Sequence, residues 1–369
     1  MKVAFVADSI PVRDGESILI NLMSGLEAPS MEILPVCPME GSLGCALKNR
    51  GCRIVDLPFK KADSPFQVAD LLANFWSIVT REDVDIIYAA SPRAARYGFS
   101  ISQVTGIPLV YHAFTGRSLG LQILMGRFAG GIVCASRHVA SRFARATVPV
   151  KVIYSGVEPS LFTSIRDKKR LRQKWGLDPD KPVIGLVTNL ESNGQADMVI
   201  RTFKQMLDDI PDSILLIAGS DLLRGTYSFE RYLLRMIRGL DLQNRVFIKR
   251  FTSFFEELYG LTDILVSPSI HEENLFPLVE AMVSGVPVVA ARSAWVTEFV
   301  SHGETGILVT EGDEHELRQT VYGLLTEPSQ AAKLGSAASA AALDRFSAEK
   351  MRENLNIFLN EISATKGGR

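Results

Sequence analysis

The feature that most constrains this chain is a regular alternation of two kinds of segment. Short runs of β-branched and other apolar residues, such as Val84–Ala89, are separated by longer amphipathic stretches, such as Phe66–Val79. The short runs predict strands that are buried on both faces, and the longer stretches predict helices that cover those faces. The alternation therefore predicts parallel sheets enclosed by helices.

The alternation occurs in two series. Strands of the first series are predicted at Val3–Ala7, Glu32–Val36, Arg53–Leu57, Val84–Ala89, Leu109–His112, Gly131–Ala135 and Val150–Tyr154, with helices among them at Ser17–Leu26, Phe66–Val79 and Arg137–Ala144. Gly156 and Pro159 interrupt the pattern, and the polar segment Thr163–Lys174 is expected to be a linker that leads into a helix. Strands of the second series are predicted at Val183–Val187, Ile214–Ala218, Val246–Lys249, Ile264–Ser267, Val288–Ala291 and Gly306–Val309. From Glu314 onward the pattern is helical, including Gln330–Arg345 and Ala348–Ile362.

The length of 369 residues allows two to three domains of about 150 residues each. We predict an α/β protein with two Rossmann-like domains, residues 1–160 and 161–345, that face a cleft. A helical tail, residues 346–369, is a candidate to cross back to the first domain. Ligands of open α/β sheets bind beyond the carboxyl ends of the strands, so we expect the functional site in that cleft.

The overall composition excludes several classes of protein. Lys and Arg (40) nearly cancel Asp and Glu (41), and 47% of the residues are hydrophobic. This argues against a disordered tail and against a nucleic-acid binder driven by bulk positive charge. The apolar start meets Asp8 before a signal core could form, and no run approaches the roughly 18 apolar residues that span a bilayer. We therefore expect a cytoplasmic protein. Its four cysteines lack metal-ligand spacing and are expected to be buried thiols.

The charge balance conceals a basic stretch in the first half of the chain. No acid occurs from Ile86 to Val157, but eight bases do: Arg93, Arg96, Arg117, Arg127, Arg137, Arg142, Arg145 and Lys151. These bases are explained equally by solvated helix surfaces and by a partner that carries phosphate or a membrane surface.

Within this stretch, Arg117–Ala129 predicts a helix that has Leu119, Ile123, Leu124 and Phe128 near one face. Packing in the core accounts for an apolar face at least as well as a partner does. The surrounding positive charge favours transient docking of this segment on anionic lipid.

The most informative segment for chemistry runs from Ser267 to Ala291. A strand is predicted to end near Ser267, a polar loop follows, and Pro277 stands where a helix is expected to begin. Free backbone amides and the helix dipole at such a start form a site for a phosphate or diphosphate. Glu272 and Glu280 lie on either side, at a spacing suited to hold sugar and ribose hydroxyls. Taken singly, Glu280 is also explained by the helix dipole, and Glu272 by solvation in a loop.

This segment resembles the E-x7-E motif of retaining glycosyltransferase family 4. Glu272 and Glu280 have the spacing of the motif, and Ser-Gly-Val-Pro-Val-Val follows from Ser284. The resemblance continues in four further segments: Lys151–Phe162, Pro182–Thr188 with Gly194, Asp263–Ser269 and Glu298–Val309. It implies the GT-B fold, which consists of two Rossmann-like domains.

The resemblance also implies roles for individual residues. Glu280 would hold the ribose of a nucleotide-sugar donor, Glu272 would contact the donor sugar, and backbone amides around Phe276, Pro277 and Leu278 would bind the diphosphate. The first domain would bind a saccharide or lipid-linked acceptor, with Arg13 and Arg117 on the acceptor side, and would supply a glycine loop at Gly15. His112 ends a predicted strand where the family often has a histidine beside the reacting sugar. A structural hydrogen bond explains such a histidine equally well.

The donor loop departs from the family pattern. Asn189 and Asn193 stand where the family commonly has an arginine and a lysine that neutralise the leaving diphosphate, and amides cannot replace that charge. Lys249, Arg250 and Arg13 are the candidates to restore it, although each could equally be a surface base.

The resemblance implies a metal-independent, retaining hexosyltransferase that needs no cofactor besides its nucleotide-sugar substrate. Bacterial cell-surface polysaccharide or lipopolysaccharide synthesis is the pathway expected at the level of the family. The missing cations keep open an inactive relative that acts in binding or assembly. A dehydrogenase that binds NAD is disfavoured, because no G-x-G-x-x-G follows Val3–Ala7.

Overall fold

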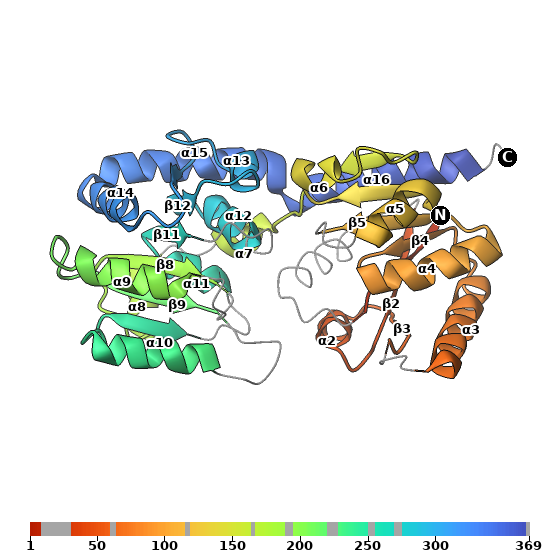
Figure 1. The fold of residues 1–369 in the computed structure, drawn as a ribbon, viewed down its shortest axis with the longest axis horizontal. Helices are drawn as coiled ribbons and strands as arrows, with labels where there is room; N and C mark the ends of the chain where they lie inside the picture. Colours follow the sequence, from red (N-terminus) through yellow and green to blue (C-terminus); the bar gives the residue numbers. More distant parts are fainter. Residues whose placement is uncertain are drawn as a thin grey trace. The chain divides into compact units, whose positions relative to one another are not determined.

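The alternating pattern folds into two α/β units. A computed structural model describes residues 1–8, 31–59, 64–114, 119–163, 167–188, 195–219, 228–249, 255–268 and 275–366. Unit 1 comprises Met1–Gly156 together with Ala348–Arg369, and unit 2 comprises Val157–Ser347. The chain therefore leaves unit 1 and returns to it at its C-terminal end (Figure 1).

The described part of unit 1 contains a parallel sheet of seven strands in the order β3-β2-β1-β4-β5-β6-β7. The strands are β1 Lys2–Val6, β2 Glu32–Cys37, β3 Val55–Asp56, β4 Ile86–Ala89, β5 Leu109–Ala113, β6 Gly131–Cys134 and β7 Val150–Val152. The chain builds outward from β1 to β3 and then resumes at β4 on the other side of β1. The topological switch point, where ligands bind in sheets of this kind, thus lies between β1 and β4.

Three of the described helices of unit 1 begin at a serine whose side chain caps the first turn. The described helices of this unit are α2 Ser42–Asn49, α3 Pro65–Arg81, α4 Pro92–Thr105, α5 Leu119–Phe128, α6 Arg137–Ser141 and α16 Ala348–Lys366. Ser91, for example, caps α4 by accepting a hydrogen bond from the amide of Ala94 at 3.1 Å, and Gly106 ends this helix in the left-handed conformation. One face of the sheet packs on α3, α4 and α5 through a buried apolar cluster that includes Val36, Phe75, Ile87, Leu109 and Leu121.

Helix α16 packs on the other face of the unit 1 sheet, at β6. A Cβ atom placed on Gly131 would lie 2.8 Å from the ring of Phe358 and 2.9 Å from Ile362. The absence of a side chain at Gly131 therefore lets α16 approach the strand directly, and this contact holds the C-terminal helix in unit 1.

The described part of unit 2 contains a parallel sheet of six strands in the order β10-β9-β8-β11-β12-β13. The strands are β8 Val183–Val187, β9 Ile214–Ala218, β10 Val246–Lys249, β11 Ile264–Ser267, β12 Val288–Ala291 and β13 Ile307–Val309. Its switch point lies between β8 and β11. The described helices are α7 Pro159–Thr163, α8 Lys168–Lys174, α9 Ala196–Met206, α10 Ser228–Gly239, α11 Phe255–Leu261, α12 Leu275–Val283, α13 Val296–Phe299, α14 Glu314–Thr326 and α15 Pro328–Phe346.

Two sequence expectations need correction, and one is confirmed. The segment Thr163–Lys174, expected to lead into a helix, ends with the whole of α8 and belongs to unit 2. Helix α6 ends at Ser141 rather than Ala144. Cys37 and Cys134 are buried thiols as predicted, but Cys45 is exposed and Cys52 is half-buried. The predicted helix Ser17–Leu26 lies outside the described residues.

Candidate functional site

The switch point of unit 2 brings the predicted anion site and a buried carboxylate together. Helix α12 follows β11, which pairs directly with β8, so the helix starts beside the carboxyl end of the first strand of the unit. Both strands run in the same direction, so their carboxyl ends lie side by side at the same edge of the sheet. This is the position at which an open α/β sheet binds a nucleotide.

Helix α12 begins at Leu275, two residues earlier than the sequence pattern suggested from Pro277. Proline is tolerated throughout a first helical turn, because the amides of that turn have no acceptor within the helix. Pro277 itself has no amide hydrogen, so the predicted group of Phe276, Pro277 and Leu278 offers fewer donors than three residues suggest. The first turn instead begins with the amides of Leu275 and Phe276.

Glu280 lies in the second turn of α12 and is only 8% exposed. The hydroxyl of Tyr259 donates to its Oε2 at 2.7 Å, and the hydroxyl of Ser284 donates to its backbone carbonyl at 2.8 Å. A carboxylate at this depth requires hydrogen-bond donors, because burial of an ionised group without partners is costly. The structure therefore supports Glu280 as a fixed acceptor rather than as a solvated first-turn acid.

Tyr259 is a second residue of this site, and the sequence pattern did not identify it. It lies in α11, is fully buried and packs at 5.8 Å against the ring of Phe162 from α7. A buried tyrosine hydroxyl almost always has a hydrogen-bond partner, which is the signal that could have pointed to it. Tyr259 fixes the rotamer of Glu280 across 21 positions of the sequence.

Lys249 ends β10, at the edge of the unit 2 sheet, where its carbonyl accepts from the amide of Gly219. Strands β9 and β8 lie between β10 and β11. At about 4.8 Å per strand, the backbone of Lys249 is roughly 14 Å from the axis of β11. Lys249 is therefore placed for the base end of a nucleotide better than for a phosphate at α12.

In unit 1, His112 lies on β5 and is 2% exposed. Its Nδ1 is 2.6 Å from the hydroxyl of Tyr88 on the neighbouring strand β4, and its ring stacks on Phe114 at 3.8 Å. Its Nε2 is buried without a hydrogen-bond partner among the described residues. Burial lowers the pKa of His112 to about 3, and burial also raises the pKa of Tyr88 well above its ordinary value. Both side chains are therefore neutral near pH 7.

The remaining predicted site residues lie outside the described residues: Arg13, Gly15, Arg117, Asn189, Asn193, Arg250 and Glu272. Their roles stay predictions, and so does the spatial arrangement of the two glutamates of the E-x7-E motif.

Helix α5 presents the apolar side chains that the sequence pattern singled out. Leu121 and Met125 are buried against the sheet, whereas Leu119, Ile123 and Phe128 are 71%, 63% and 51% exposed. Core packing thus does not account for the second group. We call Leu119, Ile123 and Phe128 the α5 face.

Basic side chains border the α5 face. Arg127 lies over the ring of Phe128 at 5.6 Å, and Phe128 contacts Phe99 of α4 at 6.1 Å. Exposed Arg96 is one turn before Phe99 on α4. An exposed apolar group with a basic border is typical of a surface that meets an anionic partner. Over the described residues, no helix has both the length and the apolar character to cross a membrane.

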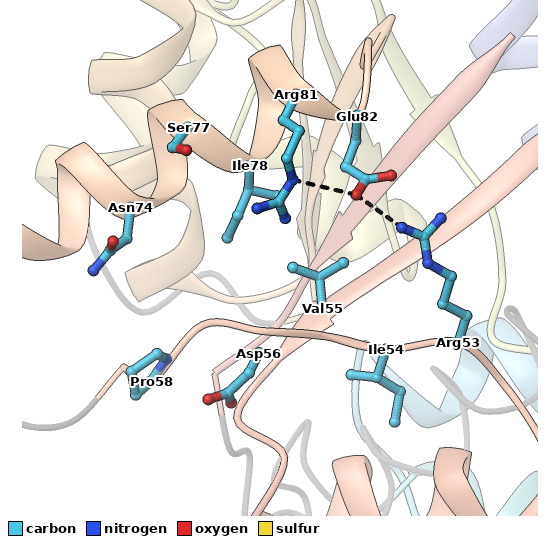
Figure 2. Close-up of a pocket in the computed structure, with 10 residues that line it drawn as sticks. All are labelled: Arg53, Ile54, Val55, Asp56, Pro58, Asn74, Ser77, Ile78, Arg81 and Glu82. Atoms are coloured by element: carbon cyan, nitrogen blue, oxygen red, sulfur yellow. Dashed lines mark hydrogen bonds and ion pairs between the residues drawn. The ribbon is translucent and has the colours of Figure 1, made fainter.

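A pocket of about 520 Å³ lies elsewhere in unit 1, between β3 and the second half of α3. Figure 2 shows Arg53 and Arg81 directed at Glu82, to whose Oε1 they lie at 2.8 and 3.6 Å. The two guanidinium groups are thus already partnered by a carboxylate. None of the predicted site residues lines this pocket.

Comparisons with known proteins point to one family. Residues 167–341 match the family described as "Glycosyl transferases group 1". A GDP-mannose-dependent alpha-(1-6)-phosphatidylinositol monomannoside mannosyltransferase of Mycolicibacterium smegmatis is 31% identical over 236 residues, which cover 60% of each chain. A lipopolysaccharide core biosynthesis mannosyltransferase of Rhizobium meliloti is 27% identical over 202 residues, which cover 53% of this chain and 56% of the relative. The chain thus aligns with little more than half the length of these two relatives.

A solved structure covers more of the chain. The crystal structure of HepE from Anabaena in complex with UDP and glucose has a TM-score of 0.85 and 26% sequence identity, and the match covers 98% of this chain and 100% of that one. The fold and the family model agree with the fold class predicted from the sequence.

Proposed function

We propose that this chain, which has the GT-B fold and whose residues 167–341 match the group 1 glycosyl transferases, moves a sugar from a nucleoside diphosphate to a hydroxyl acceptor with retention of configuration. The observation that carries the proposal is the buried carboxylate of Glu280, held by Tyr259 in the helix that starts at the switch point of unit 2. A fixed, desolvated acceptor at this place suits the two hydroxyls of a ribose.

The start of α12 is proposed to bind the diphosphate. First-turn amides and the positive end of the helix dipole attract an anion, and Glu280 is one turn further along the helix. One nucleotide could thus contact both features. Glu272 is proposed to contact the donor sugar.

The proposed mechanism needs no protein nucleophile. The acceptor hydroxyl attacks the anomeric carbon on the face from which the diphosphate departs, and the departing phosphate oxygen accepts the proton of that hydroxyl. The stereochemistry is retained because bond formation and bond cleavage occur on the same face. Neutral His112 is proposed to lie beside the reacting sugar rather than to remove the proton, because its pKa of about 3 makes it a poor base.

Negative charge on the leaving diphosphate still requires compensation. We expect Arg250 or Arg13 to supply it in place of the cations missing at Asn189 and Asn193, and Lys249 is the less favoured of the three candidates because its strand lies at the edge of the sheet. Replacing each base with Ala should lower turnover for at least one of the three. Full turnover in all three variants would mean that helix amides alone suffice, and a gain from Asn189→Arg with Asn193→Lys would show a cation-poor natural site.

The direct test of the function is transfer by the purified chain. A thermal-shift screen over UDP, GDP and their sugar conjugates identifies the donor, since a ligand of the folded state raises its stability. The selected donor is then incubated with lipid-linked and soluble saccharides, and NMR of the product gives its anomeric configuration. We expect retention and no loss of rate with EDTA. An inverted product would refute the mechanism.

Binding without turnover would favour the alternative, an inactive relative that acts in binding or assembly. The absence of the usual donor-loop cations is the observation that supports it. Binding of UDP or GDP with neither transfer nor hydrolysis of any sugar conjugate would decide for this alternative.

We further propose that the α5 face docks on anionic lipid at the cytoplasmic membrane and so meets a lipid-linked acceptor. Its exposed side chains and basic border support this placement. The acceptor of the Mycolicibacterium relative, a phosphatidylinositol monomannoside, is such a molecule. Cell-surface polysaccharide or lipopolysaccharide synthesis is the proposed pathway, in keeping with the name of the Rhizobium relative.

Vesicle flotation tests the docking. Each base near an anionic surface contributes about 1 kcal/mol, so binding should require anionic lipid and weaken with salt. Ile123→Ser should weaken binding to anionic vesicles about tenfold or more, because one buried apolar side chain contributes roughly 1.5–3 kcal/mol. Phe66→Ser, at another exposed apolar position (87% exposed) on α3, is the matched control. Equal recovery of both variants and the native chain would contradict the docking.

A further inference from the structure

Three aromatic residues and His112 form a continuous row across the centre of the unit 1 sheet. Phe5 of β1 is the register partner of Tyr88 of β4, and their rings stack at 4.2 Å. Tyr88 meets the edge of the His112 ring on β5 at 5.8 Å, and His112 stacks on Phe114, just beyond the strand. The row leads from the interior of the sheet to its carboxyl edge, and its rings leave His112 little freedom to rotate.

The bond between Tyr88 and His112 can be made in two ways, and they leave different numbers of polar groups without partners. If the Tyr88 hydroxyl donates to Nδ1, the imidazole proton is on Nε2, and only the Nε2–H lacks a partner among the described residues. If Nδ1–H donates to the Tyr88 oxygen, both the hydroxyl proton and the Nε2 lone pair lack partners there. A buried polar group without a partner is costly, so the first arrangement is favoured.

We propose that Tyr88 is a positioning residue that holds His112 as its Nε2–H tautomer, so that the ring presents a neutral N–H donor to a sugar hydroxyl at the carboxyl edge of unit 1. The identity of the ligand as a sugar rests on the proposed function, whereas the tautomer of His112 does not. The role assigned to His112 is then to donate a hydrogen bond, and its Nε2 cannot act as a proton acceptor.

The neutrality of both partners supports the proposal. Burial lowers the pKa of His112, so a proton is not added to the ring near pH 7, and burial keeps the Tyr88 hydroxyl protonated and able to donate. A buried N–H that has no partner among the described residues is a group that a ligand oxygen can satisfy.

Nitrogen NMR of the native chain tests the tautomer directly. With 15N-labelled histidine, long-range correlations between ring nitrogens and carbon-bound hydrogens distinguish a protonated from an unprotonated nitrogen. His112→Gln identifies the His112 signals among those of the five histidines. We expect an unprotonated Nδ1 and a protonated Nε2. An Nδ1–H tautomer in the native chain would overturn the proposal, whether or not any variant folds.

Two tyrosine variants then test the cause. Tyr88→Phe keeps the ring in the row and removes only the hydroxyl, so the Nδ1 signal should shift and both tautomers should appear. Tyr111→Phe is the matched control, since Tyr111 is buried on the opposite face of the same sheet within the cluster that packs on the helices. Unchanged His112 signals in Tyr88→Phe would overturn the proposal.

Kinetic measurements separate the tautomer of His112 from its role in sugar transfer. In a chain that transfers sugar, Tyr88→Phe should lower kcat about tenfold or more and leave the Kd for the nucleoside diphosphate, bound by unit 2, unchanged. An unchanged kcat would show that the orientation of His112 is irrelevant to transfer. If the native chain transfers no sugar, the proposed function fails, and the NMR result alone decides the tautomer.

Discussion

Replacing Glu280 with Ala is expected to weaken nucleotide binding and to destabilise unit 2 by separate routes. Binding weakens because the variant has no carboxylate to accept from the ribose hydroxyls. Stability falls because the buried hydroxyl of Tyr259, now 2.7 Å from Oε2, loses its acceptor. The conservative variant Glu280→Gln retains an oxygen for Tyr259 and removes only the charge.

The magnitudes follow from the burial of the pair. A hydrogen bond to a charged group contributes about 1.5–3 kcal/mol, so the Kd of Glu280→Ala for the donor should rise roughly 10- to 150-fold. Loss of the Glu280 acceptor of the Tyr259 hydroxyl should lower the free energy of unfolding by about 1–3 kcal/mol. Glu280→Gln should show most of the loss in affinity and a smaller loss in stability.

Calorimetric titration of the donor and denaturant unfolding measure the two effects separately. Glu257→Gln is the matched control, because Glu257 is a partly buried carboxylate in the same unit that accepts from Lys174 and Trp175, each at 2.6 Å. It should lose stability and keep its donor affinity. Unchanged donor affinity and turnover in folded Glu280→Ala would refute the assignment of the ribose site.

Three further outcomes are expected. Burial raises the pKa of Asp263, but the cations that pair with this carboxylate outweigh burial and hold the pKa below its usual range. The contribution of Asp263 to stability is therefore present above about pH 4 and is lost as the pH falls further. Asp263→Asn should lower the free energy of unfolding by about 2 kcal/mol at pH 7 and should reduce this acid sensitivity, as measured by urea unfolding from pH 3 to 7. Lys249→Ala should weaken nucleotide binding less than Glu280→Ala does, because β10 is at the edge of the sheet, and an equal or larger rise in Kd by calorimetry would contradict this placement. Gly335→Ala should lower the Tm, because the added Cβ would meet the carbonyl oxygen of Gly285. Gly323→Ala should raise the Tm, because its Cβ would lie in open space on a helix. Thermal unfolding of the two variants would contradict this if both shifts in Tm had the same sign.

The strands of unit 2 show how accurately the local hydrophobic pattern predicts the bounds of a strand. Among the described residues of unit 2, the strands from β8 to β12 have the predicted bounds, and β13 begins one residue later than predicted. Parallel strands buried on both faces are continuous apolar runs that end at polar or turn residues, so the local sequence determines where they begin and end. Helix ends were less accurate, as at α6 and α12, because the first and last turns depend on capping contacts as well as on periodicity.

The site was predictable only in part. The spacing around Glu280, and its likeness to a known motif, indicated a nucleotide site. Tyr259 and Tyr88, which contact Glu280 and His112, carried no motif at all. Each belongs to an element that is separate in sequence from its partner, and only the packing of α11 on α12 and the order of β4 and β5 bring the pairs together.

The sequence by itself determined the α/β class, the two series of strands and the residues able to carry charge or accept hydrogen bonds, because hydrophobic period and residue chemistry are local properties. Tertiary structure decided the order of the strands, and with it the two switch points. It also decided that Leu121 is buried while Ile123 is exposed on the same apolar helix. Tertiary structure also determined which tyrosine contacts each buried polar group. These outcomes depend on distances between segments remote in the chain, and such distances exist only once the sheets have assembled.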